Sequence, residues 1–108
     1  MFDNTLHSPH NSANIRQTLD RRTRTRVLQF IRNGESDRAI GITISAIFPR
    51  LRIEISDDNI VRVLDHVTCR RLDMAVNAGA HKTAADHLMH SILAKAKAIC
   101  NEDASLAI

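Results

Sequence analysis

The sequence predicts a mostly helical fold with one short strand, at about residues 50–55, through which two copies of the chain pair. Residues 50–56 alternate polar with apolar side chains, which is the period of a half-buried strand. Four other stretches show apolar residues at helical spacing, and nothing after residue 56 indicates a second strand. A lone strand leaves its backbone N–H and C=O groups unpaired, so its simplest partner is the same strand of a second copy.

The charge along the chain indicates a partner that carries phosphate groups. The 108 residues hold 15 Lys and Arg against 12 Asp and Glu, and twelve of the basic residues are Arg. Residues 1–52 contain nine of these Arg and only four acids, whereas the rest of the chain is slightly acidic. Arginine suits phosphate and base-edge recognition because its planar guanidinium binds two acceptors at once. Three Phe and no Trp or Tyr leave few surfaces on which single-stranded nucleic acid could stack.

Residues 1–13 are polar, and we expect them to form a flexible tail before a single helical domain at 14–100. Apolar residues fall at helical spacing from residue 14 to residue 32, and Asn33-Gly34 predicts the end of this first helix. Its middle carries four arginines that cannot all face a core: Arg21, Arg22, Arg24 and Arg26. They predict either a solvated face or additional contacts to phosphate.

The segment at 36–48 fits two patterns. Ser36 or Asp37 can cap a helix there. The buried face of that helix is then Ala39, Ile40, Thr43, Ile44, Ile47 and Phe48. Its β-branched residues also alternate with small or polar ones, as in a strand. We predict a helix, because Pro49 alone leaves too little chain for a turn into the following strand.

A third helix is predicted at about 57–78, directly after the strand. Ser56 or Asp57 is its cap, and apolar residues follow at helical spacing from Ile60 to Val67. Arg70-Arg71 then stand where the next apolar pair should fall, so the helix either changes partner there or breaks. Asn77-Ala78-Gly79 predicts its end.

The last helix has the clearest pattern. Thr83 and Asp86 match the spacing of a capping box. The apolar stripe that follows is Ala85, Leu88, Met89, Ile92, Leu93, Ala96 and Ile99. We expect residues 101–108 to form a frayed carboxyl end.

This order of strand, helix, turn and helix resembles the ribbon-helix-helix family of DNA-binding regulators, and its helix spacing is similar to that of the TraM-like plasmid relaxosome proteins. The resemblance covers residues 50–98 and is carried by 51–58, by Ile60, Leu64 and Val67, and by 81–89. It implies an intertwined homodimer whose paired strands enter the major groove of double-stranded DNA, with Arg50, Arg52 and Glu54 facing base edges. Its dimer core would contain Leu51, Ile53, Ile55, Leu64, Leu88 and Ile92.

The amino end of the last helix is the second predicted contact to DNA. Free N–H groups near Thr83 and Ala84, flanked by His81 and Lys82, would form a phosphate site. A histone-like fold, with a long central helix after residue 55, is an alternative over the same region.

Catalytic and metal-binding patterns are not indicated. His81, His87 and His90 cluster near Asp86 without a recognised ligand spacing, so we expect no metal and no cofactor. The two Cys are far apart and fit no redox motif, which predicts a cytoplasmic protein. No apolar run approaches a membrane span, so we expect no membrane contact. Without a catalytic pattern, we expect a non-enzyme.

Two functions fit these observations. The first is a homodimeric, sequence-specific DNA-binding protein that regulates transcription or plasmid transfer. The alternative is an all-α protein-interaction module (an adaptor, an antitoxin-like protein or a nucleoid-modulating protein) that recognises a protein partner and does not read DNA.

Overall fold

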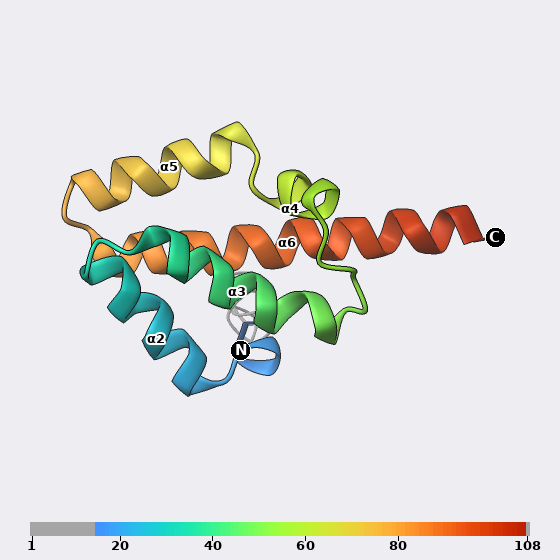
Figure 1. Cartoon of the computed structure of the whole chain (residues 1–108), viewed down its shortest axis with the longest axis horizontal. Helices are drawn as coiled ribbons and strands as arrows, with labels where there is room; N and C mark the ends of the chain where they lie inside the picture. Colours follow the sequence, from blue (N-terminus) through green and yellow to red (C-terminus); the bar gives the residue numbers. More distant parts are fainter. Residues whose placement is uncertain (1–14, 108) are drawn as a thin grey trace, which may run out of the picture.

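The computed structural model describes the backbone of residues 15–107 and the side chains of residues 15–102 (Figure 1). Residues 15–18 are helical, and five further helices follow. Their bounds are α2 Arg21–Arg32, α3 Ser36–Arg50, α4 Asp57–Val63, α5 His66–Asn77 and α6 His81–Ala107. The predicted flexible tail at 1–13 lies outside the described residues. The expectation of a mostly helical chain therefore agrees with the structure, but the expectation of a strand does not.

Helix α6 is the axis of the molecule. It packs against α2, α3, α4 and α5, and Figure 1 shows α5 along one side of it and α3 with α2 along the other. Four residues at a spacing of four are fully buried along α6: Ala84, Leu88, Ile92 and Ala96. A second row beside them, Ala85, Met89 and Leu93, is nearly as buried. Two adjacent apolar rows let one helix receive partners on two sides.

The first predicted helix, at about 14–32, is interrupted. Asp20 adopts an extended backbone conformation, and its carboxylate accepts a 2.7 Å hydrogen bond from the backbone N–H of Thr23, which makes it the N-cap of α2. Leu19, immediately before the cap, is almost completely buried. The prediction of one continuous helix is wrong, because the hydrogen bond that the Asp20 side chain accepts as a cap stabilises the chain more than an interior helical position of Asp20 would.

The ambiguous segment at 36–48 is helical, as predicted. Helix α3 buries Ala39, Thr43 and Ile47 on one row and Ile44 with Phe48 on the next, which is the helical pattern and not the alternating one. Thr43, although fully buried, donates its hydroxyl to the carbonyl of Ala39 at 2.7 Å. The helix begins after the turn at Gly34, whose φ of 76° lies in the left-handed region.

The predicted strand at 50–55 is wrong, and with it the ribbon-helix-helix dimer. Between residues 15 and 107 the chain forms no strand. The segment is instead a helix end: the N–H of Ile53 donates to the carbonyl of Phe48 at 2.9 Å, and Arg52 between them has a φ of 58°. This is the hydrogen-bond pattern that closes many helices, with Arg52 where glycine is usual. Ile53 is buried in its own chain's core, whereas Ile55 is 52% exposed.

The helix predicted at 57–78 is two helices. Asp65 caps α5 by accepting a 2.9 Å hydrogen bond from the N–H of Thr68, so the chain turns at Leu64 and Asp65. The break precedes Arg70-Arg71, where the apolar stripe had lost its phase, and it lets α4 and α5 pack separately against α6. A histone-like long central helix is excluded by the same break.

Helix α6 begins two residues before the predicted cap. The N–H of Ala84 already donates to the carbonyl of Ala80 at 2.9 Å, so Thr83 lies inside the first turn and is not its N-cap. At the other end the helical backbone continues past Asn101 to Ala107. None of the described helices combines the length and the apolar character that crossing a membrane requires.

Candidate anion-binding site

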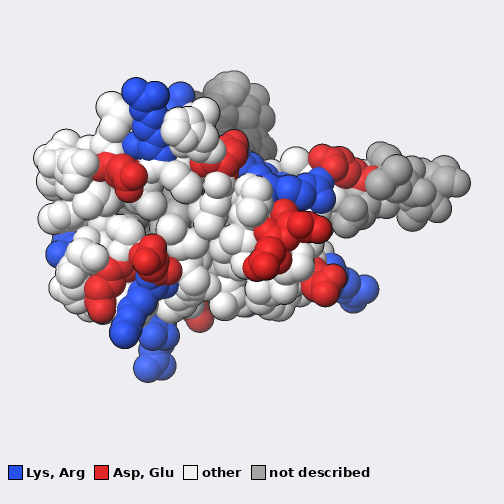
Figure 2. All heavy atoms as spheres, turned by 45° about the horizontal axis from the view of Figure 1, so that its top comes forward, with Lys and Arg blue, Asp and Glu red and all other residues white. Residues whose placement is uncertain are grey.

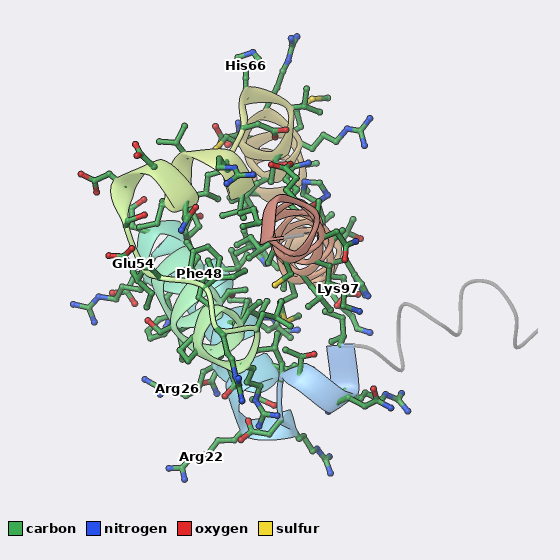
Figure 3. The ribbon with its side chains drawn as sticks, turned by 90° about the vertical axis from the view of Figure 1, so that its right-hand side faces the viewer. Arg22, Arg26, Phe48, Glu54, His66 and Lys97 are labelled. Atoms are coloured by element: carbon green, nitrogen blue, oxygen red, sulfur yellow. The ribbon has the colours of Figure 1, made fainter. Side chains whose placement is uncertain are left out.

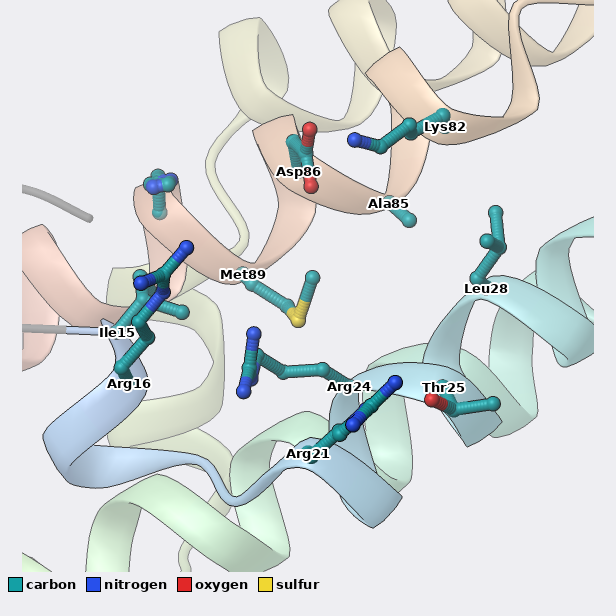
Figure 4. A pocket seen from close by; sticks show the side chains of 11 residues that line it. Ile15, Arg16, Arg21, Arg24, Thr25, Leu28, Lys82, Ala85, Asp86 and Met89 are labelled. Atoms are coloured by element: carbon teal, nitrogen blue, oxygen red, sulfur yellow. The ribbon is translucent and has the colours of Figure 1, made fainter. Parts of the chain in front are cut away.

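A hollow of about 540 Å³ lies between α2, the first turns of α6 and the chain at residues 15–16 (Figure 4). Its lining is Ile15, Arg16, Arg21, Arg24, Thr25, Leu28, Lys82, Ala85, Asp86, Met89 and His90. We call this hollow the basic cleft. Its lining residues come from two stretches far apart in sequence, 15–28 and 82–90, so the fold and not a local motif assembles it.

Among the described residues, cations outnumber carboxylates in the basic cleft by four to one. Arg16, Arg21, Arg24 and Lys82 line it, and Asp86 is the single acidic residue that residues 15–102 contribute to its walls. Like charges that share one hollow repel each other, and the repulsion is strongest where water is partly excluded. The arrangement therefore favours an anion as occupant.

The amino ends of two helices lie at the cleft, and only that of α2 is balanced by a capping carboxylate. Arg21 is the first residue of α2, and Lys82 is the second residue of α6. Neither helix has an acidic residue in its first turn, where a carboxylate would balance the helix dipole. At α2 the balance comes from Asp20 before the helix, and the hydrogen bond from the Thr23 N–H lowers the pKa of this carboxyl below its ordinary value.

The guanidinium of Arg24 is held in place by the backbone. Its Nε donates to the carbonyl of Leu19 at 3.2 Å, across the break between the first helical turn and α2. The bond fixes the side chain on the cleft side of α2 (Figure 4). The interruption at Leu19 and Asp20 thus supplies the carbonyl that orients a residue of the cleft.

Part of the cleft wall is apolar. Ile15, Ala85 and Met89 are buried core residues that also line it, and Leu28 extends the same surface from α2 (Figure 4). A hollow with apolar walls and a few converging polar groups is the usual form of a small-molecule site.

His90 lies where the basic cleft meets a second hollow of about 520 Å³ beside α6. Its Nε2 is buried and has no hydrogen-bond partner among the residues that the structure describes. Leaving a buried polar atom unpaired costs about 1–3 kcal/mol.

The structure brings together residues from two separately predicted phosphate contacts. Arg21 and Arg24 of the basic run and Lys82 at the amino end of α6 line the same cleft. Arg22 and Arg26 point away from the body of the molecule on the α2 side (Figure 3). The guanidinium of Arg26 lies 5.7 Å from the centre of the Phe30 ring, a cation–π contact on the outer face of α2.

The rest of the predicted phosphate site at 81–84 is not formed as expected. The N–H of Ala84 is used within the helix, and its side chain is fully buried, so Ala84 has no group to offer an anion. His81 is half-buried and Thr83 is exposed, and neither lines the basic cleft.

The residues expected to read bases lie elsewhere. Arg50, Arg52 and Glu54 are exposed at the junction of α3 and α4, and Arg50 donates to the carbonyl of Gln17 at 3.2 Å. Without a ribbon these three side chains lack the regular spacing that base-edge contacts need. Two residues of the expected dimer core, Leu88 and Ile92, are instead fully buried within one chain.

His81, His87 and His90 do not form a metal site in the described part of the chain. Within residues 15–102, no three His, Cys, Asp or Glu side chains come close enough to hold one ion. His87 has a structural position: its Nε2 is 3.2 Å from the carbonyl of Thr68, and its Nδ1 is 3.2 Å from the hydroxyl of Ser91. The imidazole therefore joins α5 to α6.

Sequence reasoning missed Arg16, Asp86 and His90 as members of one site. Arg16 stood in a predicted continuous helix, and nothing in the sequence indicated that it lies near residues 82–90. Searches against protein-family models, curated proteins and solved structures find no match for this chain.

Proposed function

We propose that this chain binds double-stranded DNA through the phosphate backbone, using the basic cleft and the outward arginines of α2 as its contact surface. The observation that carries the proposal is the convergence of Arg16, Arg21, Arg24 and Lys82 on one hollow against a single carboxylate. Phosphate contacts of this kind supply most non-specific affinity for DNA, because each one releases a condensed counterion. Base reading by a ribbon is not part of the proposal.

Two further arginines lie on the outer face of α2. Arg22 and Arg26 are exposed there and add two cations to the helix that carries Arg21 and Arg24 (Figure 3). The side of the molecule that α4 and α5 form has a different character, because its acidic and basic side chains are interspersed (Figure 2). A polyanion would therefore be attracted to the α2 side and not to the α5 side.

A gel-retardation titration with random-sequence duplex DNA tests the proposal. We expect retardation at low salt, with log K falling by about 0.9 for each phosphate that the protein neutralises as log salt rises. The double variant Arg21→Ala/Lys82→Ala should weaken binding several-fold and reduce the salt slope by up to about 2.

Arg70→Ala/Arg71→Ala is the matched control, because it removes the same charge from exposed positions of α5, away from α2 (Figure 1). If the control pair weakened binding as much as the cleft pair, the effect would come from net charge and the proposed surface would be wrong.

A protein-interaction module is the second candidate, and one observation favours it. Val67 and Met74 of α5 are 55% and 63% exposed, and they share a helix face with Arg70 and Arg71. Large apolar side chains at the surface of a small domain are common at protein contacts. Absence of retardation at low salt would favour this face as the functional surface.

A further inference from the structure

We infer that the basic cleft also binds a small organic phosphate of about nucleotide size, and that this ligand opposes DNA binding. The second part of the inference rests on the proposed function, whereas the first part stands on the cleft alone.

The cations of the cleft have no ion-pair partner among the described residues. Ion pairs in the described residues join Arg38 to Glu35, Arg62 to Glu102 and Lys95 to Asp65. None of the four cations of the basic cleft forms an ion pair with a carboxylate among residues 15–102. A phosphate monoester carries close to two negative charges at neutral pH and accepts several hydrogen bonds, so it matches guanidinium groups arranged around one space.

The size and lining of the cleft indicate more than a bare phosphate ion. Its volume of about 540 Å³ falls in the range of sites for small organic ligands. Ile15, Leu28 and Met89 offer an apolar surface for a ring, while Thr25 adds a hydroxyl on the α2 side. The charged wall and the apolar wall therefore suit the two halves of one molecule, a phosphate and an organic body.

Competition with DNA follows from shared residues. Arg21 and Lys82 line the cleft and also belong to the proposed DNA contact surface. A bound phosphate monoester would neutralise them and place negative charge where the DNA backbone approaches, which raises the repulsion between protein and DNA. The small ligand would thus act as a negative regulator of DNA binding.

Isothermal titration calorimetry on the full chain tests the binding step. The probes are adenosine 5′-monophosphate, inorganic phosphate and adenosine, all at the same ionic strength. We expect the nucleotide to bind at least about tenfold more tightly than either fragment, because only the nucleotide uses both walls. Equal affinity for nucleotide and inorganic phosphate would overturn the inference, as would the absence of binding at millimolar nucleotide.

Arg21→Ala and Arg22→Ala form a matched pair of variants. Both remove one exposed arginine from the first turn of α2, but only Arg21 lines the cleft. We expect Arg21→Ala to lower the affinity for adenosine 5′-monophosphate about tenfold or more, since it removes a charge-assisted hydrogen bond, and Arg22→Ala to leave it nearly unchanged. Equal losses in the two variants would show a diffuse charge effect and overturn the site.

Repeating the DNA titration with the nucleotide present separates the two proposals. We expect the nucleotide to reduce retardation of the wild-type chain. DNA binding without nucleotide binding would leave the proposed function standing and overturn this inference. Nucleotide binding without any DNA binding would overturn the proposed function and the regulatory step, while the ligand site itself would be supported.

Discussion

Asp65 shows how one residue sets both a helix start and a pH dependence. Its carboxylate accepts hydrogen bonds from Thr68 and lies 3.3 Å from the Nζ of Lys95, and these partners, Thr68 first, lower the pKa of Asp65 to about 2. Because the folded pKa lies below the ordinary value of 3.8, the carboxylate contributes stability at neutral pH. We expect that contribution to be lost as pH falls from about 4 to about 2.

Asp65→Asn isolates the charge, because asparagine can still cap a helix. Urea unfolding at pH 7, 4 and 2.5 should show a smaller loss of stability on acidification for this variant than for the wild type. Asp73→Asn is the control, since it removes an exposed carboxylate of α5 that is not a helix cap. An equal change in the two variants would mean that the cap and Lys95 do not hold the charge of Asp65.

The turn that ends helix α3 can be tested by replacing Arg52, the residue with a positive φ in that turn. A non-glycine residue at a φ of 58° is strained by about 1–2 kcal/mol. We expect Arg52→Gly to stabilise the chain by up to about 1 kcal/mol in urea unfolding, because the released strain exceeds the added entropy of the unfolded glycine. In a paired strand the same change would destabilise the fold, so a loss of stability would contradict the turn.

The helical content could be predicted from the sequence, but the breaks between helices could not. Both missed breaks carry the same signal, an Asp three residues before a Thr, at Asp20-Thr23 and Asp65-Thr68. The signal is weak because Asp also occurs on exposed helix faces, and only packing decides between the two. The strand predicted at 50–55 was wrong because the signal was short. Polar and apolar residues can alternate by chance over the few residues of a helix end and the loop that follows it.

The basic cleft could be identified only in the folded structure. Arg21, Arg24 and Lys82 were each predicted as phosphate contacts, whereas Arg16 was not. Arg21 and Lys82 are 61 positions apart in the sequence and meet only because α2 packs on α6. Periodicity predicts which face of a helix is buried but not which element covers that face. For the same reason the sequence did not show that Leu88 and Ile92, expected in a dimer core, are buried inside one chain.

The single-chain core has a consequence for folding. Leu88 and Ile92 are fully buried by residues of their own chain, and we therefore expect the chain to fold without a second copy. We expect the urea midpoint of the chain to be the same at 1 and 100 μM protein. An obligate intertwined dimer would instead gain about 2.7 kcal/mol of apparent stability over that hundredfold range.

Leu88→Ala is the matching variant. It should destabilise the chain by about 2–5 kcal/mol through the cavity it leaves, by the same amount at both protein concentrations. Two results together would show that α6 completes its core with a second copy. The urea midpoint of the wild type would rise with protein concentration, and Leu88→Ala would lower the midpoint more at 1 μM than at 100 μM. Equal midpoints would show that one chain buries α6 by itself, and that its basic cleft is complete in the monomer.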